Sequence, residues 1–193
     1  AASDLSAISE KTTGNITATN VTTLTGTASE IATLISDEAD TGNGVNLAAN
    51  VTATVTGTVA ATDLTTINNG TTGLITATGV TTITGTASAV VAVIDAEADT
   101  GNAINLDTNF LVTITPAGSA VATDLSTINT ETSGLVTATN VTEITGTLSE
   151  IKAVTDAEGD TGDKINLDGD FTATVSDTGS VAASDLTSVS GKT

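Results

Sequence analysis

A tandem repeat of about 60 residues runs through the whole chain and limits what it can fold into. Segment 16–26 returns at 75–85 and again at 136–146, so the copies follow one another at nearly equal offsets. The acidic segment 38–43 returns at the same offsets. A unit of this size cannot bury its apolar face alone, so we expect neighbouring copies to stack on one another.

Each unit divides further into two related halves of about 30 residues. Residue types that tolerate a left-handed backbone, and so suit a corner between two short strands, recur once in every half. They are Asn20, Asn50, Gly79, Asn109, Asn140 and Asp170. Segments 16–19 and 51–56 alternate small apolar residues with threonine, which is the period of a half-buried strand. Each half is therefore predicted to contain a strand, a corner, a second strand and a helix.

Apolar residues spaced three or four positions apart predict the helices. They are Ile31, Leu34 and Ile35; Leu64 and Ile67; Val90, Val91 and Ile94; Leu125 and Ile128; Ile151 and Val154; and Leu186 and Val189. Two helix starts carry a further signal, because Thr27 with Glu30 and Thr147 with Glu150 fit a capping box. In that motif each side chain satisfies a backbone N–H that the helix itself leaves unpaired.

These patterns predict an α/β repeat solenoid in which parallel strands stack and short helices lie along one side. We expect one continuous solenoid with a partial, helical repeat at 1–15 and full repeats at 16–74, 75–135 and 136–193. One coil would be a half-repeat of about 30 residues, and a single coil of about 60 residues is the alternative. Three separate α/β beads are disfavoured because no Pro-rich or Gly/Ser-rich linker divides the units.

The two ends of the chain share one helical element, because segment 2–12 closely matches segment 183–193. Solenoids that stand alone need atypical polar caps at their ends, and neither end has the sequence of a cap. We therefore expect the repeat to continue beyond this chain, either covalently or by copies that stack end to end.

The composition argues against an enzyme. The sequence has no His, Cys, Met, Trp or Tyr, its four cationic residues are all lysines, and its only aromatic residues are Phe110 and Phe171. General acid–base and nucleophilic mechanisms lack their usual groups here. A core of small aliphatic residues suits a thin structure that repeats one shape. We therefore expect no catalytic activity.

The charge is strongly negative, with 23 acidic residues against four lysines and a net charge of −19. Nucleic-acid binding needs cations that replace the counterions of phosphate, so this surface would repel it, as it would an anionic membrane. No apolar run approaches the length of a membrane span. The remaining partner classes are further copies of the chain and glycans.

An acidic segment supplies the only candidate metal site. Asp95, Glu97 and Asp99, and again Asp156, Glu158 and Asp160, place carboxylates at alternate positions before a glycine turn. Ca²⁺ prefers six to eight oxygen ligands, and each segment would supply three. Acids at a helix C-terminus also oppose the helix dipole unless something compensates them. The simpler interpretation is a solvated acidic turn. No cofactor is required, and calcium is the one candidate.

Threonine pairs supply a second candidate surface. They are Thr17/Thr19, Thr52/Thr54, Thr76/Thr78, Thr113/Thr115, Thr137/Thr139 and Thr172/Thr174. Ranks of threonine on a parallel sheet resemble the ice-binding faces of some β-solenoid antifreeze proteins. The pairs alternate between the first and second strand of successive halves, so we do not expect them to share one face. Threonine is also a common outward residue of a strand.

The run 63–73, continued by 75–88, resembles the Thr-rich tandem repeats of giant secreted bacterial surface proteins, cyanobacterial ones among them. The resemblance covers essentially the whole chain and implies an extracellular or cell-surface location. It also implies a structural role in a fibre, sheath, surface layer or adhesin stalk that acts by stacking and self-assembly. The alternative function is a calcium-stabilised adhesive module that binds glycans or surfaces, with ice binding third.

Overall fold

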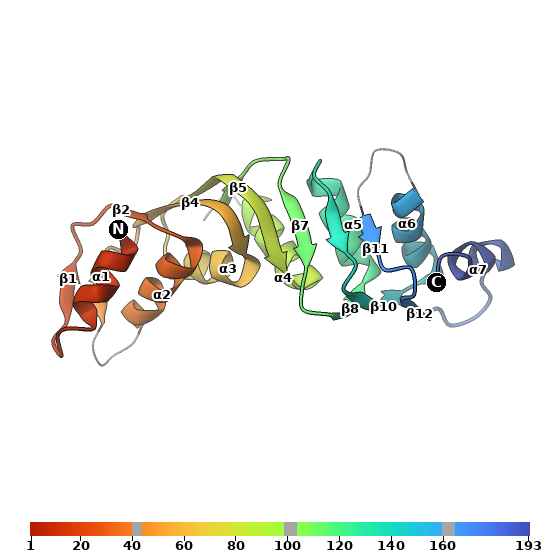
Figure 1. Ribbon diagram of the computed structural model, residues 1–193, viewed down its shortest axis with the longest axis horizontal. Helices are drawn as coiled ribbons and strands as arrows, with labels where there is room; N and C mark the ends of the chain where they lie inside the picture. The colour runs from red at the N-terminus through yellow and green to blue at the C-terminus, as the bar shows by residue number, and fades with distance from the viewer. Residues whose placement is uncertain (40–43, 99–103, 160–164) are drawn as a thin grey trace. The chain divides into compact units, whose positions relative to one another are not determined.

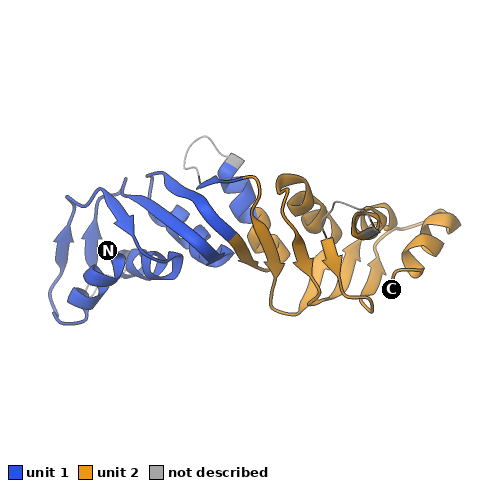
Figure 2. Cartoon of the chain, turned by 45° about the horizontal axis from the view of Figure 1, so that its top comes forward, with its two compact units in different colours: residues 1–81, 92–107 blue, residues 82–91, 108–193 orange. Residues whose placement is uncertain are grey.

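The computed structural model describes residues 1–39, 44–98, 104–159 and 165–193, and the chain divides into two compact units (Figure 2). Unit 1 comprises Ala1–Thr81 and Ala92–Asp107, and unit 2 comprises Thr82–Val91 and Thr108–Thr193. The boundary falls inside the second sequence repeat. Strand β5 (Ile75–Gly85) and helix α4 (Ala87–Ala98) therefore contribute residues to both units.

Both units are α/β (Figure 1). Besides its parts of β5 and α4, unit 1 contains α1 (Ala2–Ser9), β1 (Ile16–Ala18), β2 (Thr23–Thr25), α2 (Ala28–Ala39), β3 (Val45–Leu47), β4 (Thr52–Ala60), α3 (Ala61–Gly70) and β6 (Ile104–Leu106). Besides its parts of β5 and α4, unit 2 contains β7 (Leu111–Ile114), β8 (Gly118–Val121), α5 (Ala122–Glu131), β9 (Val136–Ala138), β10 (Val141–Gly146), α6 (Leu148–Gly159), β11 (Ile165–Leu167), β12 (Thr172–Val175) and α7 (Ala183–Ser190). Most helices follow two strands, whereas α4 follows one long strand and α5 follows three strands. The helices expected from the apolar spacing all form.

The strands pair in parallel, as expected, and most partners are equivalent positions of successive half-repeats. In unit 1, Ile16 of β1 lies opposite Val45 of β3, and β2 pairs with β4 at the same offset. In unit 2, Thr84 of β5 lies opposite Thr113 of β7, and β9 and β10 pair with β11 and β12. We call this offset the long step. Strands one half-repeat apart in sequence are therefore neighbours in the sheet.

A second pairing offset in unit 2, which we call the short step, joins positions that are closer in sequence. Val112 of β7 lies opposite Val136 of β9, and Ala120 of β8 lies opposite Ile144 of β10 at the same offset. At this step β7, the second strand of its half, pairs with β9, the first strand of the next half, and β8 pairs with β10, the second strand of that half. In unit 2 the long step from β5 to β7 is thus followed by the short step from β7 to β9 and by the long step from β9 to β11.

The core is aliphatic and follows the alternation of the strands. Strand β4 buries Ala53, Val55 and Val59, and the threonines between them face outward. The two phenylalanines are almost fully buried and occupy equivalent positions one full repeat apart, directly before β7 and β12. The small aliphatic core inferred from the composition is the one that forms.

The corners between consecutive strands of a half are tight turns, but their backbone differs from the expectation. The N–H of Val21 donates to the carbonyl of Ala18 at 2.9 Å, and Val51 donates to Ala48 at 3.0 Å. No non-glycine residue in the described ranges has a positive φ, so the left-handed corners predicted from Asn20, Asn50 and their equivalents are wrong. Gly79 lies within β5, where a Cβ would stand only 2.7 Å from Cγ2 of Thr56. Close approach, and not handedness, requires that glycine.

Both predicted capping boxes form. Thr27 N–H donates to Oε2 of Glu30 at 2.8 Å, and Glu30 N–H donates to Oγ1 of Thr27 at 3.2 Å. Thr147 and Glu150 repeat this exchange at the start of α6. Helix α6 receives an additional cap, because Asp177 Oδ2 accepts the N–H of Leu148 at 2.6 Å.

A contact that we call the threonine clasp closes the chain after α3. The hydroxyl of Thr71 donates to the carbonyl oxygen of Val51, and its oxygen accepts the N–H of Gly73. The N–H of Thr72 donates to the carbonyl of Ala49 at 2.8 Å. The clasp therefore ties the end of α3 to the turn that precedes β4, across about 20 residues of chain.

The same clasp recurs after α5 in unit 2. Thr132 donates to the carbonyl oxygen of Phe110, Gly134 donates its N–H to Thr132, and Ser133 N–H reaches the carbonyl of Thr108 at 2.8 Å. A Cβ on Gly134 would collide with the Phe110 oxygen, and one on Gly73 would collide with the Val51 oxygen. Glycine is needed at this position because the turn packs directly against its backbone.

Candidate functional site

The predicted calcium ligands begin inside helices. Asp95 and Glu97 belong to α4, and Asp156 and Glu158 belong to α6. Residues two apart on a helix do not face each other, so neither pair points its carboxylates at a common ion in the way that a loop would. Asp99 and Asp160, the third ligand of each set, lie outside the described residues.

In unit 2 two of these carboxylates are paired with lysines. Asp156 accepts a hydrogen bond from Lys152 one turn earlier on α6, and this bond is the main reason that the pKa of Lys152 is raised. Glu158 Oε2 lies 3.9 Å from Nζ of Lys192, which follows α7. Within the ranges described, no three His, Cys, Asp or Glu side chains gather closely enough to hold a metal ion. The calcium site stays a prediction.

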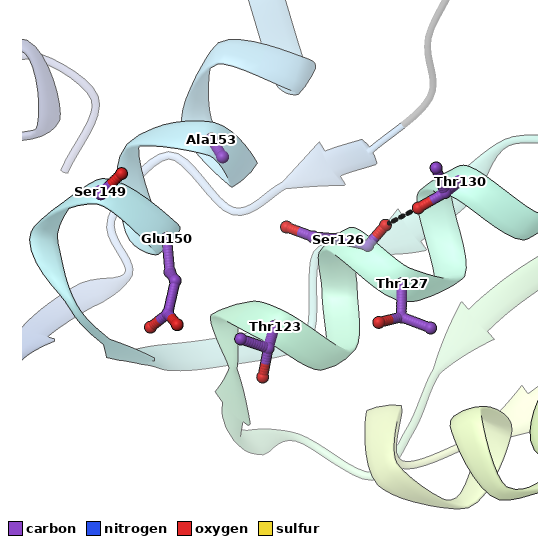
Figure 3. A pocket seen from close by; sticks show the side chains of 7 residues that line it. All are labelled: Thr123, Ser126, Thr127, Thr130, Ser149, Glu150 and Ala153. Atoms are coloured by element: carbon purple, nitrogen blue, oxygen red, sulfur yellow. Dashed lines mark hydrogen bonds between the residues drawn. The ribbon is translucent and has the colours of Figure 1, made fainter.

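A shallow hollow of about 380 Å³ lies between α5 and α6 in unit 2 (Figure 3). Helix α5 contributes four hydroxyl side chains, and α6 adds Ser149, Glu150 and Ala153. The α5 residues are Thr123, Ser126, Thr127 and Thr130. Thr130 donates back to the carbonyl of Ser126, as Figure 3 shows, and Glu150 is engaged in the capping box of α6. Some polar groups that line the hollow are thus already hydrogen-bonded within their own helices.

Unit 1 has an equivalent hollow of about 280 Å³ between α1 and α2. Its lining includes Ser3, Ser6, Ser29 and Glu30, which occupy the repeat positions of Thr123, Ser126, Ser149 and Glu150. Neither lining contains an aromatic side chain, and both phenylalanines of the chain are buried. Sugar rings could therefore bind here through hydrogen bonds alone, without the ring stacking that aromatic side chains supply.

Two of the predicted threonine pairs meet where Thr113 lies opposite Thr137. Some members of the other pairs lie opposite other residue types, as Thr17 does with Asn46 and Thr76 with Asn105. In unit 2, Thr84 lies opposite Thr113 and Thr113 lies opposite Thr137. The long step joins Thr84 to Thr113, and the short step joins Thr113 to Thr137 because it places β7 beside β9. In unit 1 the hydroxyls of Thr23 and Thr52 are 2.9 Å apart.

The threonine surface is interrupted by other side chains. Leu111 lies opposite Thr82 and is exposed, and Glu143 stands opposite Thr172, where its Oε1 accepts a 2.6 Å hydrogen bond from Thr174. A charged and an apolar residue among the threonines make the surface chemically mixed. Ice binding stays a prediction, and an assay of thermal hysteresis tests it.

Sequence reasoning missed the threonine clasp. Its signal is present in the sequence, because Thr-Thr-Gly or Thr-Ser-Gly stands at 12–14, 71–73 and 132–134, at the offsets of the repeat. The pattern resembles an ordinary loop, and only the contact with a turn about 20 residues away gives it meaning.

No protein-family model, no curated protein and no solved structure matches this chain. A proposal about function therefore has to be argued from the parallel pairing, the hydroxyl-lined hollows and the clasps. Of the helices in the described ranges, none combines the length and the apolar character that a membrane crossing needs.

Proposed function

We propose that this chain is a structural repeat segment of an extracellular surface fibre, sheath, surface layer or adhesin stalk, and that it works by stacking. The observation that carries the proposal is the long step, the parallel pairing of equivalent strands in successive half-repeats. A segment that pairs with its own next half-repeat presents a similar edge again after each half, so it extends without a built-in end.

The same register favours a solenoid whose coil is one half-repeat of about 30 residues. If one coil comprised a whole repeat, equivalent strands of successive whole repeats would be the neighbours in the sheet. At the short step β7 pairs with β9, which is the first and not the second strand of the next half. Every second coil would therefore be offset by one strand from the coil before it. The repeating building block would then be a doublet of coils.

The chemistry of the surface supports a structural role. Its polar groups are mainly hydroxyls and carboxylates, and several of them hold turns, helix starts or neighbouring strands together. A net charge of −19 keeps such a chain soluble and limits unspecific contact with nucleic acid and anionic membranes. Further copies of the same repeat are the partners that its strand edges fit. No catalytic role is part of the proposal.

The test is a series of chains lengthened by whole repeats, such as segment 75–135 inserted in tandem, with their length measured by electron microscopy and small-angle X-ray scattering. Ten added units contain twenty coils of the proposed size, so a particle should lengthen by roughly 100 Å at a strand spacing of about 4.8 Å. A gain of about half that value would indicate that each coil is a whole repeat. Separate beads, or a length that does not grow in proportion to the number of units, would contradict the solenoid.

A further inference from the structure

The threonine clasp occurs a third time in the sequence, at Thr12, Thr13 and Gly14 of unit 1. The local half of the contact is formed there, because Gly14 N–H donates to Oγ1 of Thr12 at 3.1 Å. The turn that the clasp holds elsewhere is not against it. A Cβ on Gly14 would meet only Oγ1 of Thr12, at 3.7 Å, whereas one on Gly134 would collide with a backbone carbonyl. This clasp has room for a turn.

A turn of the matching kind lies at the other end of the chain. Segment 169–171 holds the repeat position of 108–110, which Thr132 clasps, and β12 follows it as β7 follows 108–110. The equivalent clasp residue, Thr193, directs its hydroxyl to the carbonyl of Ser190 at 3.4 Å. Strand β12 pairs with β10 and stands at the end of its sheet in the described residues, so its other edge is open to a parallel strand.

Apolar side chains around this edge are exposed where their internal equivalents are buried. Leu186 of α7 is 49% exposed, and its equivalent Leu125 in α5 is fully buried. Val181 is 39% exposed, and its equivalent Ala120 in β8 is 5% exposed. Inside the chain, the equivalent residues in β8 and α5 are followed by β9, β10 and α6. The elements that would cover Val181 and Leu186 are therefore the equivalents of β9, β10 and α6.

We propose that the C-terminal edge of unit 2 docks the 12–25 segment of a second copy of this chain. Strand β1 of the second copy adds to β12 in parallel, in the register that Val112 and Thr113 of β7 show with Val136 and Thr137 of β9. That register places Ile16 opposite Ala173 and Thr17 opposite Thr174. Gly14 then lies against the turn at 169–171. The inference rests on the proposed stacking function and names the surfaces that carry it.

Docking leaves room for only one of two equivalent helices, since segments 2–12 and 183–193 occupy the same place in the repeat. Helix α7 stays, because it keeps Val189 buried and because Lys192 lies beside Glu158 of α6. Helix α1 of the incoming copy gives way, because Ala2 is its one buried residue and Ile8 is 53% exposed. Leu186 of α7 then covers the surface that Leu5 of α1 covered before.

Cysteine cross-linking tests the register directly, because the natural chain contains no cysteine. A chain with Thr17→Cys is mixed with a chain with Thr174→Cys under mild oxidation, at a salt concentration that screens the acidic surfaces. We expect the mixed disulfide dimer to form much faster than with the matched control, in which Thr62→Cys, an exposed threonine on α3, replaces Thr17→Cys.

A glycine variant separates docking from folding. In the free chain the Cβ of Gly14→Ala makes only an ordinary contact with Oγ1 of Thr12, at 3.7 Å, so its melting temperature should equal that of the unaltered chain. In the docked state its Cβ would collide with the turn, so cross-linking of Thr17→Cys with Thr174→Cys should fall at least about tenfold. Gly118→Ala, which adds a Cβ into open space but lies on β8, is the control and should change neither.

Cross-linking equal to that of the Thr62 control, or unaffected by Gly14→Ala, overturns the docking. If such chains still form filaments, the proposed function stands and the copies meet through another surface. If no association occurs at any concentration, the docking is likewise wrong. The length of the chains with added repeats then tests the proposed function independently, because covalently linked repeats need no docking.

Discussion

The internal helices α3 and α5 and the end helices α1 and α7 share one sequence pattern and differ in what covers them. In α3, Leu64 and Ile67 are fully buried, and in α5 Leu125 and Ile128 are as well. Helix α1 exposes Ile8 at the second position of this pattern. Helix α7 does the reverse, because Leu186 at the first position is exposed and Val189 at the second is buried.

This difference shows which neighbouring helix buries each of the two apolar positions of the pattern. Helix α7 packs on α6, which precedes it, and buries its second position. Helix α1 packs on α2, which follows it, and covers its first position, Leu5, in part. The leucine therefore faces the following half and the isoleucine or valine faces the preceding half. A half-repeat gains part of its helix burial from each side, so we expect its stability to depend on the adjacent halves.

The largest expected effect comes from truncating the same leucine in the two environments. Leu125→Ala removes a fully buried side chain and should lower the free energy of unfolding by about 2–5 kcal/mol. Leu186→Ala removes an exposed one and should change it by less than about 0.5 kcal/mol. Urea denaturation measures both values. Equal losses would show that the internal and end helices do not differ in packing.

The clasp offers the same comparison for a hydrogen bond. Thr132→Val leaves the buried carbonyl of Phe110 without its partner and should lower the free energy of unfolding by about 1–3 kcal/mol. Thr12→Val alters the clasp that holds no turn, so we expect a change below about 0.5 kcal/mol in dilute solution. Urea denaturation again gives the difference. If Thr12→Val is as costly as Thr132→Val, the first clasp already holds a buried group.

Helix starts give a third and smaller contrast. Asp177→Ala removes the additional cap on α6 and should lower the free energy of unfolding by about 0.5–2 kcal/mol. The equivalent positions in the other repeats are Gly57 and Pro116, which have no side chain that could cap α2 or α4. Asp177→Asn keeps an acceptor and should recover part of the loss. Thermal unfolding followed by circular dichroism measures this loss of stability. An unchanged melting temperature in Asp177→Ala would show that Asp177 does not stabilise the start of α6.

The smallest expected effect concerns calcium. The described carboxylates of α6 are paired with lysines, and those of α4 belong to a helix, so we expect millimolar Ca²⁺ to leave the melting temperature unchanged. Magnesium at equal ionic strength is the control for screening. A rise specific to Ca²⁺ that is lost in Asp95→Asn or Asp156→Asn would instead establish the calcium loops predicted from the sequence.

The sequence predicted the features that depend on local spacing. Leu64 and Ile67 marked α3 because residues three apart share a face. Thr147 with Glu150 marked the start of α6 because a capping box is complete within one helical turn. The pairing of Thr113 with Thr137 was not predictable in this way. It depends on which strand of the next half lies alongside, and that is decided by packing between segments that local spacing does not connect.

The candidate sites show the same limit. The acidic segments were recognised by their spacing, but alternate positions converge on an ion only in a loop, and Asp95 and Glu97 continue the helix before them. The turn at Asn20 was placed correctly, while its handedness was wrong because asparagine permits a left-handed backbone without requiring it. The role of Gly134 depended on a carbonyl of Phe110, which lies before the intervening helix α5 in the chain.

The long pairing step has a mechanical consequence. Hydrogen bonds between β9 and β11, or between β10 and β12, point from one half to the next, so tension in that direction opens one strand pair at a time. Such a ladder unzips at modest force, because its bonds are loaded in sequence and do not resist together as in shear. Each opened half would release about 100 Å of slack at about 3.4 Å per residue. If the chain serves as a stalk, as proposed, we expect it to yield in steps under load.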